Sequence, residues 1–141
     1  MNRTEMLLQL KVSDIMSKDV VTVDYDDLIA KPARLMLENR MHSLLVLKYG
    51  KPAYIISSYD LIRVAYEDTF NKNPVDMLRT PVEELVKGQK LVSVEPDMSL
   101  MDALHVLTEY NIHSVPVIES GVVMGILTMM DLAKWYKGTH K

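Results

Sequence analysis

The chain has 141 residues, 48% of them hydrophobic and 25% charged, which is the composition of an ordinary globular protein with one well-filled core. The formal net charge is −3 and no basic cluster stands out, which argues against a nucleic-acid partner. No cysteine is present, so disulfides and thiolate metal sites are excluded.

The sequence gives no sign of a membrane segment. No apolar run approaches the roughly 18 residues of a spanning helix, and the N-terminus lacks the apolar core of a signal peptide. We therefore expect a soluble, cytoplasmic protein without membrane association.

The first half of the chain contains, in order, a lead-in, a helical turn, a strand, a helix, a hairpin and a closing helix. These elements are predicted at residues 1–11, 12–16, 20–23, 28–40, 43–47 with 53–57, and 60–67. Pro32 predicts an irregular start of the first long helix, because proline fits only a first helical turn.

Three acidic residues precede that helix and raise a metal hypothesis. Asp24, Asp26 and Asp27 are hard oxygen ligands, but the glycine turn and distal glutamate of a calcium loop are missing. Acidic residues ahead of a helix are also what its dipole favours, so we predict no metal site.

The second half repeats the same order of elements after a connector at residues 69–81, which contains a predicted helical piece at 75–79. A helix starts at Leu100, with Ser99 as its cap and Asp102 three residues later. The remaining elements are predicted at residues 91–94, 115–118 with 122–127, and 130–137.

Both halves end in a strand that leads into a helix through a hydroxyl followed, three residues on, by a carboxylate. The residues are Thr128 and Asp131 in the second half, and Ser57 and Asp60 in the first. Two interpretations are open at this point: the pair caps the helix, or it binds a ligand. The recurrence of the corner indicates a duplicated unit.

A shift of 71 residues aligns the two halves without a gap. It pairs His42 with His113 and Asp60 with Asp131, and roughly a quarter of positions 20–61 are identical, which is strong for an internal repeat. Neither half alone buries both faces of its sheet. We therefore expect an α+β fold of two β-α-β-β-α units packed sheet to sheet with pseudo-twofold symmetry.

This duplicated unit, with Gly125-Ile126-Leu127-Thr128 and Asp131-Leu132 closing its second copy, resembles a tandem pair of cystathionine-β-synthase (CBS) domains, a Bateman module. The resemblance covers residues 12–136. It implies CBS units at residues 12–68 and 82–137.

The resemblance further implies a regulatory ligand that contains adenosine, namely AMP, ADP, ATP or S-adenosylmethionine, bound in clefts between the units. Asp131 and Asp60 would accept ribose hydroxyls, while Thr128 and Ser57 would bond to ribose or phosphate. The favoured cleft would contain Thr128, Asp131, Met16, Val21, Thr22, Arg40 and His42. The second cleft would contain Ser57, Asp60, Val92, Ser93 and His113.

The histidines and the two copies leave further alternatives. His42 and His113 either contact phosphate or serve as hydrogen-bonded structural residues. Tyr54 stands where the second copy has Gly125, and a glycine there permits close approach of backbone or ligand. We therefore favour the Thr128 cleft over the Ser57 cleft, where Tyr59 is also bulky.

The sequence thus predicts a regulatory module without catalytic residues, metal or required cofactor, which signals to an unidentified protein. The alternative is a ligand-free dimerisation or interaction module. An enzyme is the least supported class, because no nucleophile elbow is present. A homodimer is expected, formed by exposed apolar residues that include Leu61, Ile62, Leu132 and Trp135.

Overall fold

The computed structural model describes residues 1–70 and 74–138, which form two compact units. The terminal unit comprises Met1–Val20 and Val92–Lys141, and the central unit comprises Val21–Leu91. The predicted connector falls partly outside the described residues, at 71–73. Within the described ranges, no helix is both long and apolar enough to cross a membrane.

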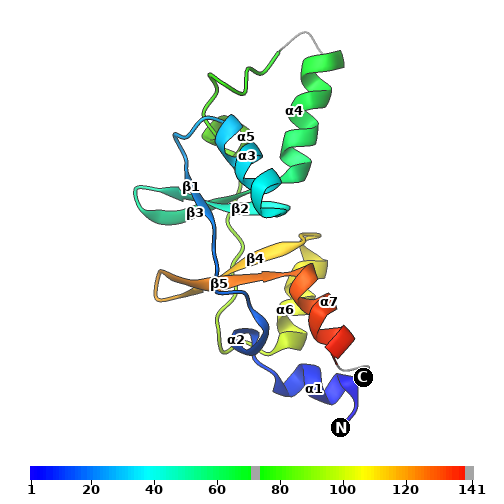
Figure 1. The fold of residues 1–141 in the computed structure, drawn as a ribbon. Helices are drawn as coiled ribbons and strands as arrows, with labels where there is room; N and C mark the ends of the chain where they lie inside the picture. Colours follow the sequence, from blue (N-terminus) through cyan, green and yellow to red (C-terminus); the bar gives the residue numbers. More distant parts are fainter. Residues whose placement is uncertain (71–73, 139–141) are drawn as a thin grey trace. The chain divides into compact units, whose positions relative to one another are not determined.

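The central unit is a three-stranded sheet with helices on one face (Figure 1). In the sheet, β1 runs parallel to β2, and β2 runs antiparallel to β3. The elements are β1 (Thr22–Asp24), α3 (Ala30–Asn39), β2 (Ser43–Lys48), β3 (Lys51–Ser57), α4 (Ser58–Phe70) and α5 (Glu83–Val86). Pro32 lies in the first turn of α3, where proline is tolerated.

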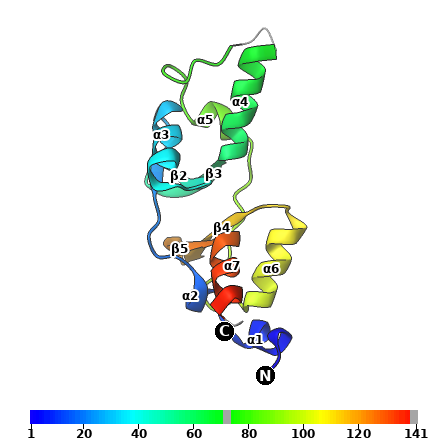
Figure 2. The same ribbon diagram turned by 45° about the vertical axis from the view of Figure 1, so that its right-hand side comes forward.

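The terminal unit is built on a two-stranded hairpin. Its elements are α1 (Arg3–Gln9), α2 (Val12–Ile15), α6 (Leu100–Glu109), β4 (Ser114–Glu119), β5 (Val122–Thr128) and α7 (Met129–Gly138). Helices α6 and α7 lie on the same face of the hairpin in both views (Figure 2). Ser99 caps α6 as predicted, because its hydroxyl accepts the Asp102 N–H at 3.1 Å.

Each unit has an apolar core between its sheet and its helices. In the central unit the core contains Val23, Met36, Leu44, Val46, Ile56, Val82 and Val86. In the terminal unit it contains Val12, Val94, Leu100, Ala103, Leu107, Val115, Val117, Leu127 and Leu132. The predicted α+β fold with two β-α units is confirmed.

The two hairpins are equivalent in detail. Both turn through a two-residue loop with positive φ, at Tyr49–Gly50 and at Ser120–Gly121, the conformation that matches the twist of paired strands. Both also carry a register shift at the same place, after Val46 and after Val117. The predicted hairpins are confirmed, and their equivalence supports the duplication.

Two short helices cross the boundary between the repeats. Val12, which begins α2, and Glu83, which begins α5, are 71 residues apart and thus equivalent. α2 precedes the first copy but packs on β5 and α7, whereas α5 precedes the second copy but packs on β3. The repeats in sequence and the compact units therefore have different boundaries.

Two predicted elements are wrong. The strand at residues 91–94 is reduced to a single bridge between Val94 and Val117. In the other copy the Leu45 N–H donates to the Val21 carbonyl. The equivalent of Leu45 is Pro116, which has no N–H to donate to Val92. The helical piece at residues 75–79 is a turn at 77–79.

The expected exposure of the dimer residues is also corrected in part. Leu132 is only 8% exposed and belongs to the core, since it faces the hairpin beneath α7. Leu61 and Trp135 are half-buried against the cores of their units, whereas Ile62 is exposed.

Candidate functional site

The corner between β5 and α7 is a capping box built from Thr128 and Asp131. The Thr128 hydroxyl accepts the Asp131 N–H at 3.1 Å, and Asp131 Oδ2 accepts the Thr128 N–H at 2.9 Å. The Thr128 hydroxyl also donates to the same Oδ2 at 3.0 Å. Both residues thereby satisfy backbone groups at the start of the helix.

The corner between β3 and α4 has the same construction. Asp60 Oδ2 accepts the Ser57 N–H at 2.8 Å and the Ser57 hydroxyl at 3.1 Å, and the Asp60 N–H points to that hydroxyl at 3.4 Å. The capping interpretation is therefore confirmed in both halves. In each box it occupies only one carboxylate oxygen, so the other oxygen decides what more the residue can do.

The second carboxylate oxygen has different partners in the two corners. Asp131 Oδ1 accepts a hydrogen bond from the Ser17 hydroxyl at 2.7 Å. Asp60 Oδ1 instead pairs with the Arg63 guanidinium at 3.3 Å, and that guanidinium also donates to the Leu85 carbonyl. One carboxylate thus holds a neutral hydroxyl, the kind of group that a ribose presents, while the other is neutralised by a cation of its own helix.

Gly125 lets the chain before the central unit pass close to β5. A Cβ at this position would lie 2.6 Å from the Ser17 carbonyl oxygen and 2.8 Å from Met16 Sδ, distances that real side chains do not adopt. The Ser17 backbone exchanges two hydrogen bonds with Ile126, each 2.9 Å long. The glycine is therefore explained by Met16 and Ser17, which are held beside the corner.

In the central unit, side chains replace this backbone pairing. The Gln89 amide bonds to both backbone groups of Ile55, the equivalent of Ile126, at 2.7 and 3.1 Å. Tyr54, at the place of Gly125, donates to Glu83 Oε2 at 3.2 Å, and Lys48 Nζ lies 2.6 Å from the same oxygen. The hydrogen bond from Lys48 lowers the pKa of Glu83 and raises the pKa of Lys48.

The predicted residues of the favoured cleft are divided between the two units. Thr128, Asp131 and Met16 come together in the terminal unit, as described above. Val21, Thr22, Arg40 and His42 belong to the central unit, so their part in a site at Thr128 stays a prediction. The side chains of Thr22, Arg40 and His42 are exposed, and Arg40 ends α3 in the left-handed conformation with φ 53°.

The residues of the second cleft divide in the same way. Ser57 and Asp60 belong to the central unit, and Val92, Ser93 and His113 belong to the terminal unit. Each histidine does have a local role through its backbone. The His42 carbonyl accepts the Ser58 N–H, and the His113 carbonyl accepts the Met129 N–H. The imidazoles of both are exposed, so a phosphate contact stays a prediction.

The strand residues that precede the two sheets differ in their hydrogen bonding. The Val21 carbonyl accepts the Leu45 N–H at 3.4 Å, a long bond. The equivalent residue of Leu45 is Pro116, which has no N–H to offer to Val92. The other differences between the copies favour the Thr128 cleft. This one favours the second cleft, because the Val92 carbonyl is freer than the Val21 carbonyl to bond to a ligand.

One member of the acidic group near α3 has partners within the protein. The carboxylates of Asp24, Asp26 and Asp27 lie within 4.8 Å of one another. However, Asp27 Oδ2 accepts the Asp24 N–H at 2.8 Å and pairs with Lys31 at 3.2 Å. These contacts explain Asp27 by the turn that it closes.

Ser17 is the site residue that the sequence did not reveal. It follows the predicted site residue Met16, but the repeat gives no signal for it because the equivalent position in the other copy is Gly88. Its contact with Asp131, 114 positions away, depends on the packing of α2 in the terminal unit.

Comparison with known proteins shows which family the chain belongs to. The uncharacterized protein MJ1404 of Methanocaldococcus jannaschii is 28% identical over 99% of this chain, which corresponds to 35% of that relative. An uncharacterized conserved protein from Pyrococcus horikoshii has a similar fold, with a TM-score of 0.79 and 23% identity over 92% of this chain and 94% of that one.

A third similar structure contains ligands. It is the CBS domain pair of protein MJ0100 in complex with 5′-methylthioadenosine and S-adenosyl-L-methionine, with a TM-score of 0.77 and 24% identity over 92% of this chain and 98% of that one. The family model of the CBS domain matches this chain twice, at residues 12–67 and 80–138. The chain therefore belongs to the CBS domain family and carries the domain as a tandem pair.

Proposed function

We propose that the chain is a regulatory module whose Thr128–Asp131 corner binds the ribose of an adenosine ligand and which has no chemistry of its own. The observation that carries this proposal is the bond between Asp131 Oδ1 and a neutral hydroxyl at 2.7 Å. A vicinal diol is a pair of such hydroxyls, and an ionised carboxylate accepts them strongly.

The ligand class is supported by the CBS domain pair of protein MJ0100, which was solved with 5′-methylthioadenosine and S-adenosyl-L-methionine. AMP, ADP and ATP contain the same adenosine and stay candidates. Residues Val21, Thr22, Arg40 and His42 would complete the site, as the family resemblance implies. Occupancy would reach a partner protein if the ligand binds one conformation of the module better than another.

Calorimetric titration of the purified chain with AMP, ADP, ATP and S-adenosylmethionine tests the proposal. Trp135 gives a second readout, because the chain's single tryptophan lies four residues beyond Asp131 on α7. We expect saturable binding of at least one compound with a change in Trp135 fluorescence. No heat with any of the four at millimolar concentration would contradict the proposal.

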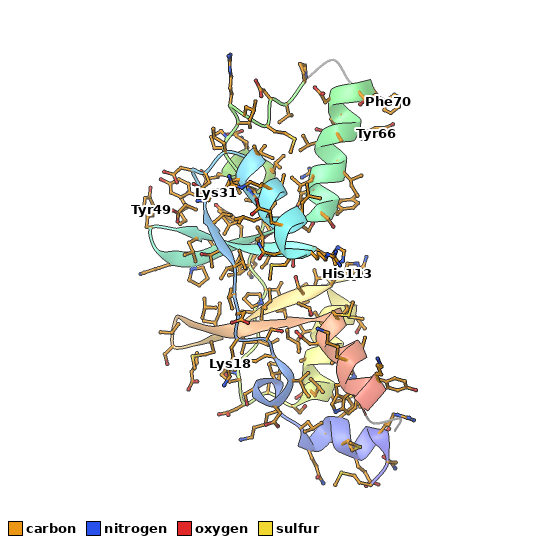
Figure 3. All side chains as sticks on the ribbon, in the orientation of Figure 1. Lys18, Lys31, Tyr49, Tyr66, Phe70 and His113 are labelled. Carbon is orange, nitrogen blue, oxygen red and sulfur yellow. The ribbon has the colours of Figure 1, made fainter. Side chains whose placement is uncertain are left out.

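A second candidate, a dimerisation module, is favoured by the apolar face of α4. Tyr59, Ile62, Tyr66 and Phe70 are 59–72% exposed and follow one side of the helix. Tyr66 and Phe70 project outward from α4, with ring centroids 4.9 Å apart (Figure 3). A homodimer through this face is compatible with ligand binding. A monomeric mass in light scattering would contradict the dimerisation candidate.

A further inference from the structure

The acceptor capacity of the Asp131 carboxylate is almost used up by the protein itself. A carboxylate offers about four lone-pair positions to donors. Oδ2 accepts the N–H and the hydroxyl of Thr128, and Oδ1 accepts the Ser17 hydroxyl. About one position remains, on Oδ1, whereas a ribose diol that binds through both hydroxyls needs two.

One of the three donors must therefore leave when such a diol binds. The Thr128 N–H is fixed by the backbone at the start of α7. The Thr128 oxygen is held beside the carboxylate because it also accepts the Asp131 N–H at 3.1 Å, so this hydroxyl can turn its proton but cannot move away. The Ser17 hydroxyl, in contrast, can move off Oδ1 as a whole by rotation about a single side-chain bond, while the two backbone bonds to Ile126 stay in place.

We propose that Ser17 is a built-in competitor of the ligand: its hydroxyl occupies Asp131 Oδ1 in the free protein and is displaced by the second hydroxyl of a ribose. This inference rests on the proposed function and adds a residue that sets affinity for a diol. Ser17 acts through Asp131 and is thus a positioning residue.

The other corner offers no equivalent device. Gly88 stands at the position of Ser17, and Asp60 Oδ1 is held by Arg63, a residue of its own helix. A diol at Asp60 would have to compete with the Arg63 guanidinium. A charged donor of this kind makes a stronger hydrogen bond to a carboxylate than a neutral hydroxyl makes. Exchange of one hydroxyl for another is therefore specific to the Asp131 corner.

The test compares adenosine, the part common to every candidate ligand, with 2′-deoxyadenosine, which has only one hydroxyl to offer at this edge of the sugar. In Ser17→Ala the competitor is absent, so we expect adenosine to bind about three- to tenfold more tightly, the value of one hydrogen bond. 2′-Deoxyadenosine needs only the free position on Oδ1, so its affinity should not change.

Two further variants separate competition from a change in folding. Ser17→Thr keeps a hydroxyl at this position and should restore the affinity of the unmodified protein for adenosine. Ser13→Ala removes a hydroxyl from α2, in the same segment and also half-buried, and should leave both affinities unchanged.

Calorimetry then gives distinct outcomes. Tighter binding of adenosine alone in Ser17→Ala supports the inference. Equal changes for both nucleosides, unchanged binding of both, or weaker binding of adenosine would overturn it while the proposed function stands. If the unmodified protein binds neither nucleoside and none of the four ligands named above, the proposed function fails and this inference fails with it.

Discussion

The Asp131 corner and the Asp60 corner share a capping box and differ in almost everything around it. Beside Asp131, the backbone of Ser17 pairs with the backbone of Ile126, and Gly125 permits this close approach. Beside Asp60, the Gln89 side chain takes the place of that backbone by bonding to Ile55, and Arg63 pairs with the second carboxylate oxygen, Oδ1. The duplication thus preserved the capping box that starts a helix, while the surroundings of the second carboxylate oxygen diverged.

The largest effect is expected from closing the gap at Gly125. In Gly125→Ala the new methyl group would meet the Ser17 carbonyl at 2.6 Å, so the segment of Met16 and Ser17 must shift or β5 must bend. We expect the terminal unit to lose about 1–3 kcal/mol of stability, the usual cost of overpacking. Trp135 fluorescence during urea unfolding measures it, because this tryptophan packs against the core of that unit.

Gly138→Ala is the matched control, since no atom of the described residues lies within 4 Å of the added methyl group. It should be neutral or slightly stabilising, because alanine favours a helix. If Gly125→Ala is as stable as Gly138→Ala, the close packing of Ser17 on β5 is not present in solution.

A smaller effect is expected at the edge of the central unit. Gln89→Ala removes both side-chain bonds to the Ile55 backbone, so the Ile55 N–H should exchange with solvent about fivefold faster, for about 1 kcal/mol of lost local stability. Hydrogen–deuterium exchange measures this rate. Gln9→Ala, at the exposed end of α1, should leave the rate unchanged, and an unchanged rate in Gln89→Ala would refute the edge-closing role.

The smallest effect is a pH dependence that arises from the Lys48–Glu83 pair of the central unit. The lowered pKa of Glu83 stabilises the fold above the ordinary carboxyl value of 4.5, and this contribution is lost as the pH falls through the lower folded value. The raised pKa of Lys48 acts at the other end, since its contribution is lost only as the pH rises above 10.5.

Urea unfolding between pH 6 and pH 3 measures the acid limb. Glu83→Gln should reduce the loss of stability on acidification relative to the unmodified protein. Glu84→Gln, one residue away and paired with Lys87 at the surface, should change the acid limb less. Equal acid limbs in both variants would show that the Lys48 pair contributes nothing.

Local patterns were sufficient to predict the hairpins, the Ser99 cap and both corners. Each rests on neighbouring residues, such as Ser99 with Asp102 or Tyr49 with Gly50, and the repeat gives every pattern a second example. Long-range packing was not predictable. The exchange of α2 and α5 between units, and the contact of Ser17 with Asp131, join segments that no spacing rule connects.

Residue chemistry also overruled the repeat at particular places. Equivalence with the strand at Val23 predicted a strand around Val94, but Pro116 lacks the N–H that the ladder requires. Helix α5 was missed although the 71-residue shift pairs it with the helical turn that was predicted at residues 12–16. Leu132 was expected at the surface and lies in the core.

The central claim is that Asp131, and not Asp60, binds the ligand. Asp131→Ala and Asp60→Ala remove the same capping box, so each should cost about 1 kcal/mol of stability, and a difference in ligand binding must come from the second carboxylate oxygen. Calorimetric titration of the two variants with the adenosine ligand that binds the unmodified protein most tightly is the direct measurement. The account predicts that Asp131→Ala loses binding and Asp60→Ala keeps it; retention in Asp131→Ala with loss in Asp60→Ala would contradict it.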